Sequence, residues 1–440
     1  MLRAGSCLAG VFVLGILPAI AVAATDYNVV GIAPLAGDNF STAFAINNSG
    51  EIIGISYDAS IQVATSTASG SLTLVSGAGF YDTGATPTVI PALGADPKGL
   101  SFATPDALND SGEVVGASTQ SGSSAMAGFI DIGGVVTNAT SLFSGVPLAV
   151  NNSGVLIAAD TSANSLVRYN GTAQSLSGLT SNSPLAYSIN NAGVAIGASQ
   201  TTISTTKSPN ADVVEWPANS TTPTDLGGLS GFAVNVPFAI NSAGDAVGYG
   251  LNPVGDTTTS VNATNANASI VLGLPESAIT TGEGSEFFNG EAFLYSANTG
   301  KFTGLGNLGG GFSMAEAVNN SDEVVGMSLT SAGDYHAFLY DDSTMTDLNT
   351  LLPSGSGWTL INADGINSAG DIVGYGDFDG TFEAYELTPS GSISGTGTSG
   401  SSGSGPSGEV VPLPAAFWSG LFLLAGLSLI ATVKRPRPAR

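Results

Sequence analysis

The sequence predicts an all-β fold built from repeats, and three observations support that prediction. A twelve-residue pattern, first seen as AINNSGEIIGIS at residues 45–56, occurs seven times. Each copy places Asn and Gly between two short apolar runs, which indicates a β-hairpin. Gly, Ser, Thr, Asn, Val and Ile are abundant from residue 25 to residue 387, and no amphipathic helical segment stands out there. We therefore expect an array of hairpins.

The centre of each copy predicts a tight turn. Asn can fold its side chain onto nearby backbone, and Gly adopts positive φ without strain. In the sixth copy Asp322 replaces Gly, and Asp is one of the few residues that tolerate the left-handed region. The later copies are ALNDSGEVVGAS from Ala107, AVNNSGVLIAAD from Ala149, SINNAGVAIGAS from Ser188, AINSAGDAVGYG from Ala239, AVNNSDEVVGMS from Ala317 and GINSAGDIVGYG from Gly365. The expected turn residues are Asn47, Gly50, Asn109, Gly112, Asn151, Gly154, Asn190, Gly193, Asn241, Gly244, Asn319, Asp322, Asn367 and Gly370.

The runs around each turn predict about four strands per repeat. Ile52, Ile53 and Ile55 form an apolar run without polar alternation, which is typical of a strand buried on both faces. A further strand follows each hairpin, at AGFY from Ala78, AGFI from Ala127, SLVRY from Ser165, VVEW from Val213, AFLY from Ala292, AFLY from Ala337 and AYEL from Ala384. Most of these are followed by a turn and another short run.

The repeat length predicts a seven-bladed β-propeller, with a parallel β-helix as the second choice. Successive motif asparagines are 62, 42, 39, 51, 78 and 48 residues apart, which brackets the roughly 40 to 50 residues of a four-stranded blade. We expect the longest insertion, at about residues 252–286, to project from the array. The last copy lacks a fourth strand, whereas YNVVGIAPLAG from Tyr27 resembles one. Since a propeller must hide its edge strands, we expect the N-terminal strand to complete the seventh blade.

The two ends of the chain predict export and a membrane anchor. Residues 1–24 combine Arg3, an apolar stretch and small residues at Ala21 and Ala23, as in a signal peptide. The repeat domain then spans residues 25–388, followed by a Ser/Gly-rich disordered linker at 389–410. Within residues 411–440, the apolar run 415–433 is long enough for a single transmembrane helix and precedes a basic tail. The basic tail is expected to stay cytoplasmic, with the propeller on the far side of the membrane.

The C-terminal segment resembles the PEP-CTERM class of sorting signals in its VPLPA-type variant. The resemblance is carried by a short motif, the apolar helix and a basic cluster, in that order: Val411, Pro412, Leu413 and Pro414, then Lys434 and Arg435. It implies a Gram-negative bacterium in which an exosortase-type protease cleaves near this motif, and passengers that associate with extracellular polysaccharide and biofilm. Leu413 stands where Glu is common, which leaves the processing enzyme open.

The repeats are similar to the HAF family of bacterial extracellular repeat proteins, named for a His-Ala-Phe signature. The signature is complete at His336, Ala337 and Phe338, and Glu291 begins the related EAF in the preceding copy. The resemblance covers almost all of residues 25–387. It implies no catalytic residue.

Charge and composition restrict the chemistry. The chain has 34 acidic and nine basic residues, so its surface repels phosphate and nucleic acid is not an expected partner. The single histidine, His336, lies in a repeated strand, so a structural role is favoured over a catalytic base. Carboxylate pairs for glycoside hydrolysis are conceivable on a propeller, but the sequence singles out no pair. Glu51, Glu113, Asp245, Glu323 and Asp371 recur after the turn, which favours a structural task.

Calcium is the ion that this composition favours, because it offers oxygen ligands and the exported part has no cysteine. The candidate ligands are Asp377, Asp379, Asp341 and Asp342, with solvated acidic turns as the alternative. Trp216 and Trp358 are the candidate sugar platforms, and both are interpreted as packing residues.

The sequence therefore predicts a cofactor-free, exported binding or structural module at the cell surface or in the polysaccharide matrix. A polysaccharide-acting hydrolase or lyase and a passive coat protein are the alternatives. Acids from several blades meeting in one central pocket would favour the enzyme.

Overall fold

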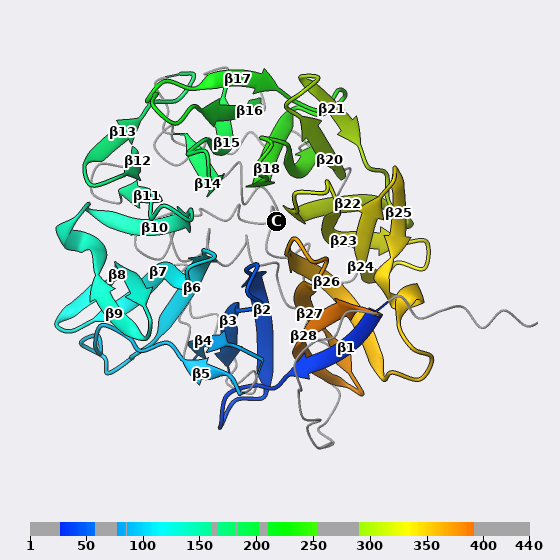
Figure 1. Cartoon of the computed structure of the whole chain (residues 1–440), viewed down its shortest axis with the longest axis horizontal. Coiled ribbons are helices and arrows are strands. Elements are labelled where there is room, and N and C mark those ends of the chain that lie inside the picture. Colours follow the sequence, from blue (N-terminus) through cyan, green and yellow to red (C-terminus); the bar gives the residue numbers. More distant parts are fainter. Residues whose placement is uncertain are drawn as a thin grey trace, which may run out of the picture.

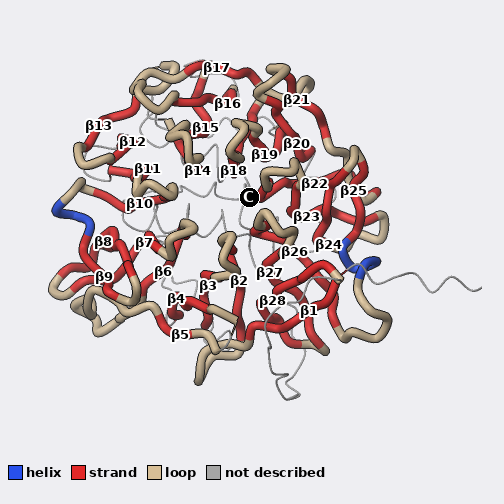
Figure 2. Tube along the Cα trace, viewed as in Figure 1, coloured by secondary structure: helices blue, strands red, loops and turns tan. Residues whose placement is uncertain are grey.

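The computed structural model of the chain describes residues 27–57, 77–84, 86–160, 165–180, 184–201, 210–252 and 290–390. These residues form an all-β structure whose sheets stand around a common centre, which is the arrangement of a β-propeller (Figure 1). Within the described part of the chain, two short 3-10 helices, η1 (Ala139–Ser141) and η3 (Leu348–Leu351), lie at the perimeter (Figure 2). The prediction of an all-β fold is confirmed.

Four of the sheets have four antiparallel strands each. The first three are β2 (Phe40–Ile46), β3 (Ile52–Tyr57), β4 (Gly77–Asp82) and β5 (Thr88–Val89); β6 (Ala103–Leu108), β7 (Glu113–Gln120), β8 (Ser123–Ile132) and β9 (Val135–Asn138); and β10 (Gly145–Val150), β11 (Leu156–Asp160), β12 (Ser165–Tyr169) and β13 (Ala173–Leu176). The fourth joins β26 (Trp358–Ile366), β27 (Ile372–Phe378) and β28 (Thr381–Pro389) to β1 (Tyr27–Ile32).

The fifth sheet has twelve strands in three groups of four. The groups are β14 (Leu185–Ile189), β15 (Ala195–Gln200), β16 (Ala211–Trp216) and β17 (Thr224–Gly227); β18 (Val234–Ile240), β19 (Ala246–Leu251), β20 (Gly290–Ser296) and β21 (Lys301–Gly304); and β22 (Gly309–Val318), β23 (Val324–Thr330), β24 (Tyr335–Asp341) and β25 (Thr344–Asp347). Parallel contacts of one residue pair each, Ala211 with Val234 and Gly290 with Phe312, connect the groups.

Each group has the same radial order. Its first strand lies nearest the centre and its last strand lies at the perimeter (Figure 1). Each copy of the twelve-residue pattern covers the end of the innermost strand, the turn and the start of the second strand. The second strands are buried on both faces, as expected from their continuous apolar runs: β3 is buried at every residue except Tyr57. The repeat therefore directs its turn toward the centre of the ring.

The N-terminal strand closes the ring. β1 pairs antiparallel with β28, from Tyr27 opposite Pro389 to Ile32 opposite Ala384. The backbone N–H of Ala384 also donates to the Ser41 hydroxyl at 3.0 Å, which ties β28 to β2. The outer strand missing from the last repeat is thus supplied by the start of the repeat domain, as the sequence predicts.

The core lies between neighbouring groups of strands. Phe80, Phe129, Phe293 and Phe338, the aromatic residues of the third-strand signature, have no exposed surface. Trp216 is also fully buried, and its indole N–H donates to the carbonyl of Ser177 at 2.9 Å. Trp358 is half-buried and packs against Phe378 and Tyr385. Both tryptophans pack in the fold, which agrees with the interpretation from the sequence.

The segments expected to direct export lie outside the described residues. These are the signal peptide at 1–24, most of the linker and sorting signal at 389–440, and residues 253–286 of the long insertion. Among the residues that the structure describes, no helix has the length and apolar character needed to cross a membrane.

Candidate functional site: a polar cavity at the centre of the ring

The motif asparagine organises each turn from within. In the first copy, the Asn47 side-chain Oδ1 accepts hydrogen bonds from the backbone N–H groups of Ser49 and Glu51, both at 2.9 Å. Gly50 has a φ of 77°, and Asp322 in the sixth copy has a φ of 63°. The structure thus places the predicted turn residues in the conformation that Gly favours and Asp tolerates.

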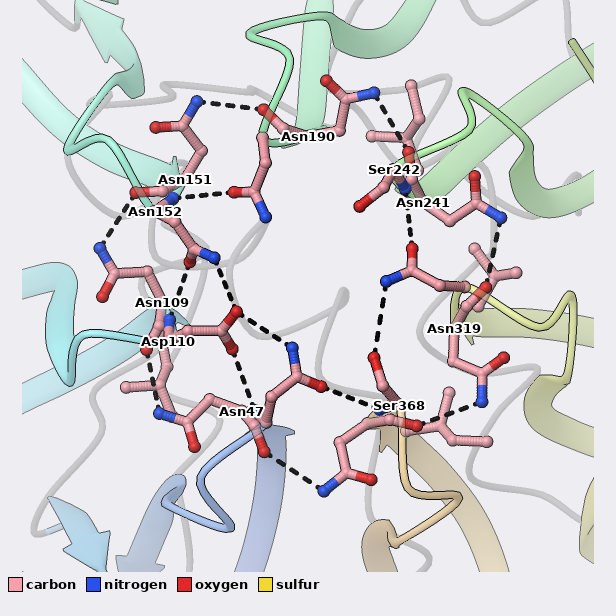
Figure 3. A pocket seen from close by; sticks show the side chains of 18 of the residues that line it. Asn47, Asn109, Asp110, Asn151, Asn152, Asn190, Asn241, Ser242, Asn319 and Ser368 are labelled. Atoms are coloured by element: carbon pink, nitrogen blue, oxygen red, sulfur yellow. Dashed lines mark hydrogen bonds between the residues drawn. The ribbon is translucent and has the colours of Figure 1, made fainter.

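The seven motif asparagines form a closed ring of hydrogen bonds. Each side-chain Nδ2 donates to the backbone carbonyl of the next motif asparagine, so the ring links successive repeats (Figure 3). The bonds run from Asn47 to Asn109 (3.0 Å), Asn109 to Asn151 (3.0 Å), Asn151 to Asn190 (3.0 Å), Asn190 to Asn241 (3.1 Å), Asn241 to Asn319 (3.2 Å), Asn319 to Asn367 (3.1 Å) and Asn367 back to Asn47 (3.3 Å). We call this set the asparagine ring. No single repeat shows this ring, because its bonds join residues 39 to 320 positions apart.

The acids that follow the turn complete the asparagine ring. Their carboxylates accept the second Nδ2 hydrogen of the motif asparagine, for example at 3.0 Å between Asn109 and Glu113. Glu51, Glu323 and Asp371 do the same in their copies. In the fifth copy the Asn241 Nδ2 lies closer to Asp322 Oδ1, at 2.9 Å, than to Asp245 Oδ2, at 3.4 Å. These acids therefore hold the amide in place, and equivalence across copies correctly indicated a structural task.

A second polar layer lies on the asparagine ring, formed by the residue after each motif asparagine. We call these the rim residues: Asn48, Asp110, Asn152, Asn191, Ser242, Asn320 and Ser368. Backbone N–H groups donate to the side-chain oxygen of the next rim residue at Asn48 to Asp110 (3.0 Å), Asp110 to Asn152 (2.9 Å), Asn152 to Asn191 (2.9 Å), Ser242 to Asn320 (3.0 Å) and Ser368 to Asn48 (2.9 Å). These five hydrogen bonds between rim residues hold most of the rim in place without a ligand.

The asparagine ring and the rim enclose a cavity of about 180 Å³. The aliphatic residue before each motif asparagine also lines it: Ile46, Leu108, Val150, Ile189, Ile240, Val318 and Ile366. Figure 3 shows the polar side chains arranged around this space. Most of these aliphatic side chains are almost fully buried, so the surface that the cavity offers to a ligand is mainly polar.

Asp110 is the acidic residue of the cavity lining. Partial burial opposes its charge, but hydrogen bonds from the Asn48 backbone and from the Asn152 and Asn48 amides hold the pKa of Asp110 below its ordinary value. Asp110 is therefore ionised at neutral pH. A glycosidase site of the usual kind needs two carboxyl groups across the scissile bond, and this lining supplies one.

The innermost strands carry a second set of residues that the sequence did not single out. Every innermost strand has a β-bulge three residues before its motif asparagine, at Phe44, Asp106, Leu148, Tyr187, Phe238, Glu316 and Asp364. The rings of Tyr187 and Phe238 lie 5.6 Å apart, so bulges of adjacent strands meet inside the ring. Burial raises the pKa of Asp106 and of Glu316 to about 8, which keeps both carboxyl groups largely neutral at pH 7.

The sequence holds a signal for the rim residues but none for the bulge residues. Rim positions are polar in all seven copies, whereas the bulge positions vary among acidic, aromatic and aliphatic residues. A bulge depends on register with the neighbouring strand, which sequence spacing does not reveal.

His336 lies away from the cavity, on β24. Its Nδ1 lies 2.6 Å from Asp347 Oδ2, and both side chains are partly buried. The hydrogen bond with Asp347 raises the pKa of His336, although burial opposes this. Asp347 also caps η3 by accepting from Asn349 N–H. The pair connects β24 to the start of η3, which is a structural role.

Of the four predicted calcium ligands, Asp341 and Asp377 lie at the ends of β24 and β27, and Asp342 and Asp379 lie in the turns that follow. Asp342 and Asp379 have φ values of 46° and 50°, and Asp377 accepts from the N–H of Gly380. The described residues contain no group of three His, Cys, Asp or Glu side chains placed to hold a metal ion. Calcium binding by Asp341, Asp342, Asp377 and Asp379 stays a prediction.

Comparison with known proteins gives likeness in structure but not in sequence. No protein-family model matches the chain, and no curated protein matches it. The chain is similar to the β-propeller domain of the Trilobed protease from Pyrococcus furiosus, with 7% identity, a TM-score of 0.44, and coverage of 80% of this chain and 96% of that one. It is also similar to YCF48 bound to D1 peptide, with 9% identity, a TM-score of 0.42, and coverage of 86% and 99%. Streptogramin B lyase matches with 9% identity, a TM-score of 0.40, and coverage of 82% and 98%. At these values the fold assignment rests on the strand pairing described above.

Proposed function

We propose that this chain is an exported, non-catalytic binding module of the cell surface or extracellular matrix. Each group of four strands is one blade, which makes a seven-bladed propeller. The sorting segment around Val411 is cleaved by an exosortase-type protease, and the basic tail at Lys434 stays cytoplasmic until then. The ligand is extracellular polysaccharide, bound over the central cavity.

The observation that carries this proposal is the rim. Seven polar residues at equivalent positions converge on one cavity, and five of their backbone N–H groups already donate to the side chain of the next rim residue. A preorganised site loses little conformational freedom on binding. Since the lining contributes one carboxylate, the geometry favours recognition over hydrolysis.

The net charge of −25 supports a neutral or cationic ligand over an anionic polymer. It also supports the solubility of an exported protein at high concentration.

The test is co-sedimentation of the purified full chain with the producing cell's extracellular polysaccharide, while sugar-chain length is followed over time. A Ser242→Trp variant fills the cavity, and Gln174→Trp places the same bulk on the exposed outer strand β13 as a control. We expect saturable binding without shortening, lost in Ser242→Trp and kept in Gln174→Trp. Shortening of the polysaccharide would establish a hydrolase or lyase instead. Absence of binding in the unaltered chain would leave a coat protein.

A further inference from the structure

We propose, resting on the function above, that the cavity recognises a single N-acetylated sugar unit through its acetamido group. The size of the cavity is the first step. Its 180 Å³ is well below the roughly 300–1,000 Å³ of pockets for drug-sized ligands. A space of this size suits one sugar unit, at a chain end or a branch, as the part of the ligand that enters the cavity.

The rim has a donor side. Asn191 Oδ1 accepts from Asn152 N–H, but its Nδ2 makes no hydrogen bond to the described residues. The hydroxyl of Ser242 likewise has no side-chain partner there, since only its backbone N–H is bonded, to Asn320. Asn320 Nδ2 lies 3.5 Å from the Ser368 hydroxyl, at the limit of a hydrogen bond. These adjacent groups are positioned to donate to a carbonyl oxygen.

The rim also has an acceptor side, centred on Asp110. Its carboxylate accepts from Asn48 N–H and Asn48 Nδ2 at 3.0 Å each, and from Asn152 Nδ2 at 2.6 Å. A carboxylate offers about four lone-pair sites, so about one remains for a ligand N–H or O–H. Asn48 and Asn152 point their amides at Asp110, so this side accepts from a ligand rather than donating to it.

An acetamido group matches this arrangement because it carries both an acceptor and a donor. Its carbonyl oxygen suits Asn191 and Ser242, and its N–H suits Asp110. A free amino sugar would pair with Asp110 but leave the donor side unmatched. The carboxylate of a uronic acid would be repelled by Asp110 and by the net charge of −25.

The experiment is isothermal titration of the purified full chain with four sugars: N-acetylglucosamine, glucose, glucosamine and glucuronate. We expect N-acetylglucosamine to bind at least fivefold more tightly than each of the others. Asn191→Asp keeps an oxygen for Asn152 N–H and removes the NH₂ donor, so it is expected to weaken N-acetylglucosamine binding at least fivefold. Gln174→Glu makes the same amide-to-carboxylate change on β13 and is expected to bind like the unaltered chain.

Asp110→Asn is the second variant, and it tests the acceptor side independently if Asn191→Asp loses its fold. It is expected to reduce the preference for N-acetylglucosamine over glucose. Equal affinity for these two sugars, or undiminished binding in both rim variants, would overturn the inference. If no monosaccharide binds while the polysaccharide still co-sediments and Ser242→Trp still blocks it, the acetamido inference fails and the proposed function stands. If the unaltered chain binds neither the monosaccharides nor the polysaccharide, both the acetamido inference and the proposed function fail.

Discussion

Replacing Asn151 with Ala is expected to lower the free energy of unfolding by about 3–5 kcal/mol, because it opens the asparagine ring. Asn151 is 3% exposed and makes three hydrogen bonds of 3.0 Å. Its Nδ2 donates to Asn190 O, and its Oδ1 accepts from Ser153 N–H and Val155 N–H. Each bond contributes roughly 1 kcal/mol net, and a buried group left without a partner costs about 1–3 kcal/mol. The estimate follows from one lost donor and two lost acceptor contacts.

Asn151 is a suitable position for this test because Val155 follows its turn, whereas five of the other copies have an acid there, which would also contact the substituted side chain. Asn151→Asp keeps the oxygen that accepts from Ser153 and Val155 but points a carboxylate oxygen at Asn190 O. Comparison of Asn151→Asp with Asn151→Ala therefore separates the contribution of the turn from that of the hydrogen bond between repeats. Asn152→Ala is the matched control, since the side chain of that rim residue makes only exposed hydrogen bonds, with the backbone N–H and the carboxylate of Asp110.

The assay is urea unfolding of the full chain and its variants at one protein concentration, with comparison of midpoints and m-values. Asn152→Ala is expected to cost less than about 1 kcal/mol. A loss below about 1 kcal/mol in Asn151→Ala would refute the reasoning, because the ring would then contribute nothing beyond exposed hydrogen bonds.

Three further predictions concern buried or paired charges. The stability of the unaltered chain should fall as the pH rises from about 4.5 to about 8, because the folded chain keeps a proton on Glu316 that the unfolded chain loses. Glu316→Gln should remove this part of the fall. Urea midpoints at pH 5 and pH 9 measure it, with Asp341→Asn as an exposed control. Asp347→Asn should cost about 1 kcal/mol at pH 5.5 and less at pH 8.5. The raised pKa of His336 gives stability that is complete below the unfolded pKa of 6.5 and is lost as the pH rises through the higher pKa of the folded chain. Equal losses at both pH values would contradict this. Arg168→Met should lower the free energy of unfolding by at least about 3 kcal/mol, because the buried guanidinium donates to the carbonyls of Trp216, Pro217, Ala218 and Ser220. Arg168→Lys keeps the charge but lacks the planar fork, so thermal melts should show it to be destabilised as well.

The sequence predicted the repeat well because turn chemistry is local. Positive φ at Gly50 and Asp322 follows from residue type, and the burial of β3 follows from an unbroken apolar run. Even the long-range pairing of β1 with β28 was predictable, since the last repeat lacked an outer strand and the N-terminus offered one. These inferences need only the pattern and the requirement that sheet edges be covered.

The cavity was less predictable because it exists only when the repeats are brought together. Asn47 reads as a turn residue in isolation, and its bond to Asn109, 62 residues away, appears only in the ring. The bulges at Asp106 and Glu316 depend on register between strands. No other copy has a basic residue at the strand position of Arg168, where Glu215 and Glu386 stand in two copies. The carbonyls that Arg168 contacts lie about 50 residues later, at the end of β16 and in the turn after it.

The division of labour between adjacent positions explains how one repeat can support a specific site. The motif asparagine is the same in all seven copies, and its Nδ2 is committed to the next repeat, so it has no freedom to specialise. The rim residue beside it donates its backbone N–H, which every amino acid except proline provides, and accepts with a side-chain oxygen, which Asp, Asn and Ser all carry. Its side chain can therefore change without opening the asparagine ring. Asp110 on one side and Ser242 on the other are such changes, and they give a cavity built from near-identical repeats two chemically different sides.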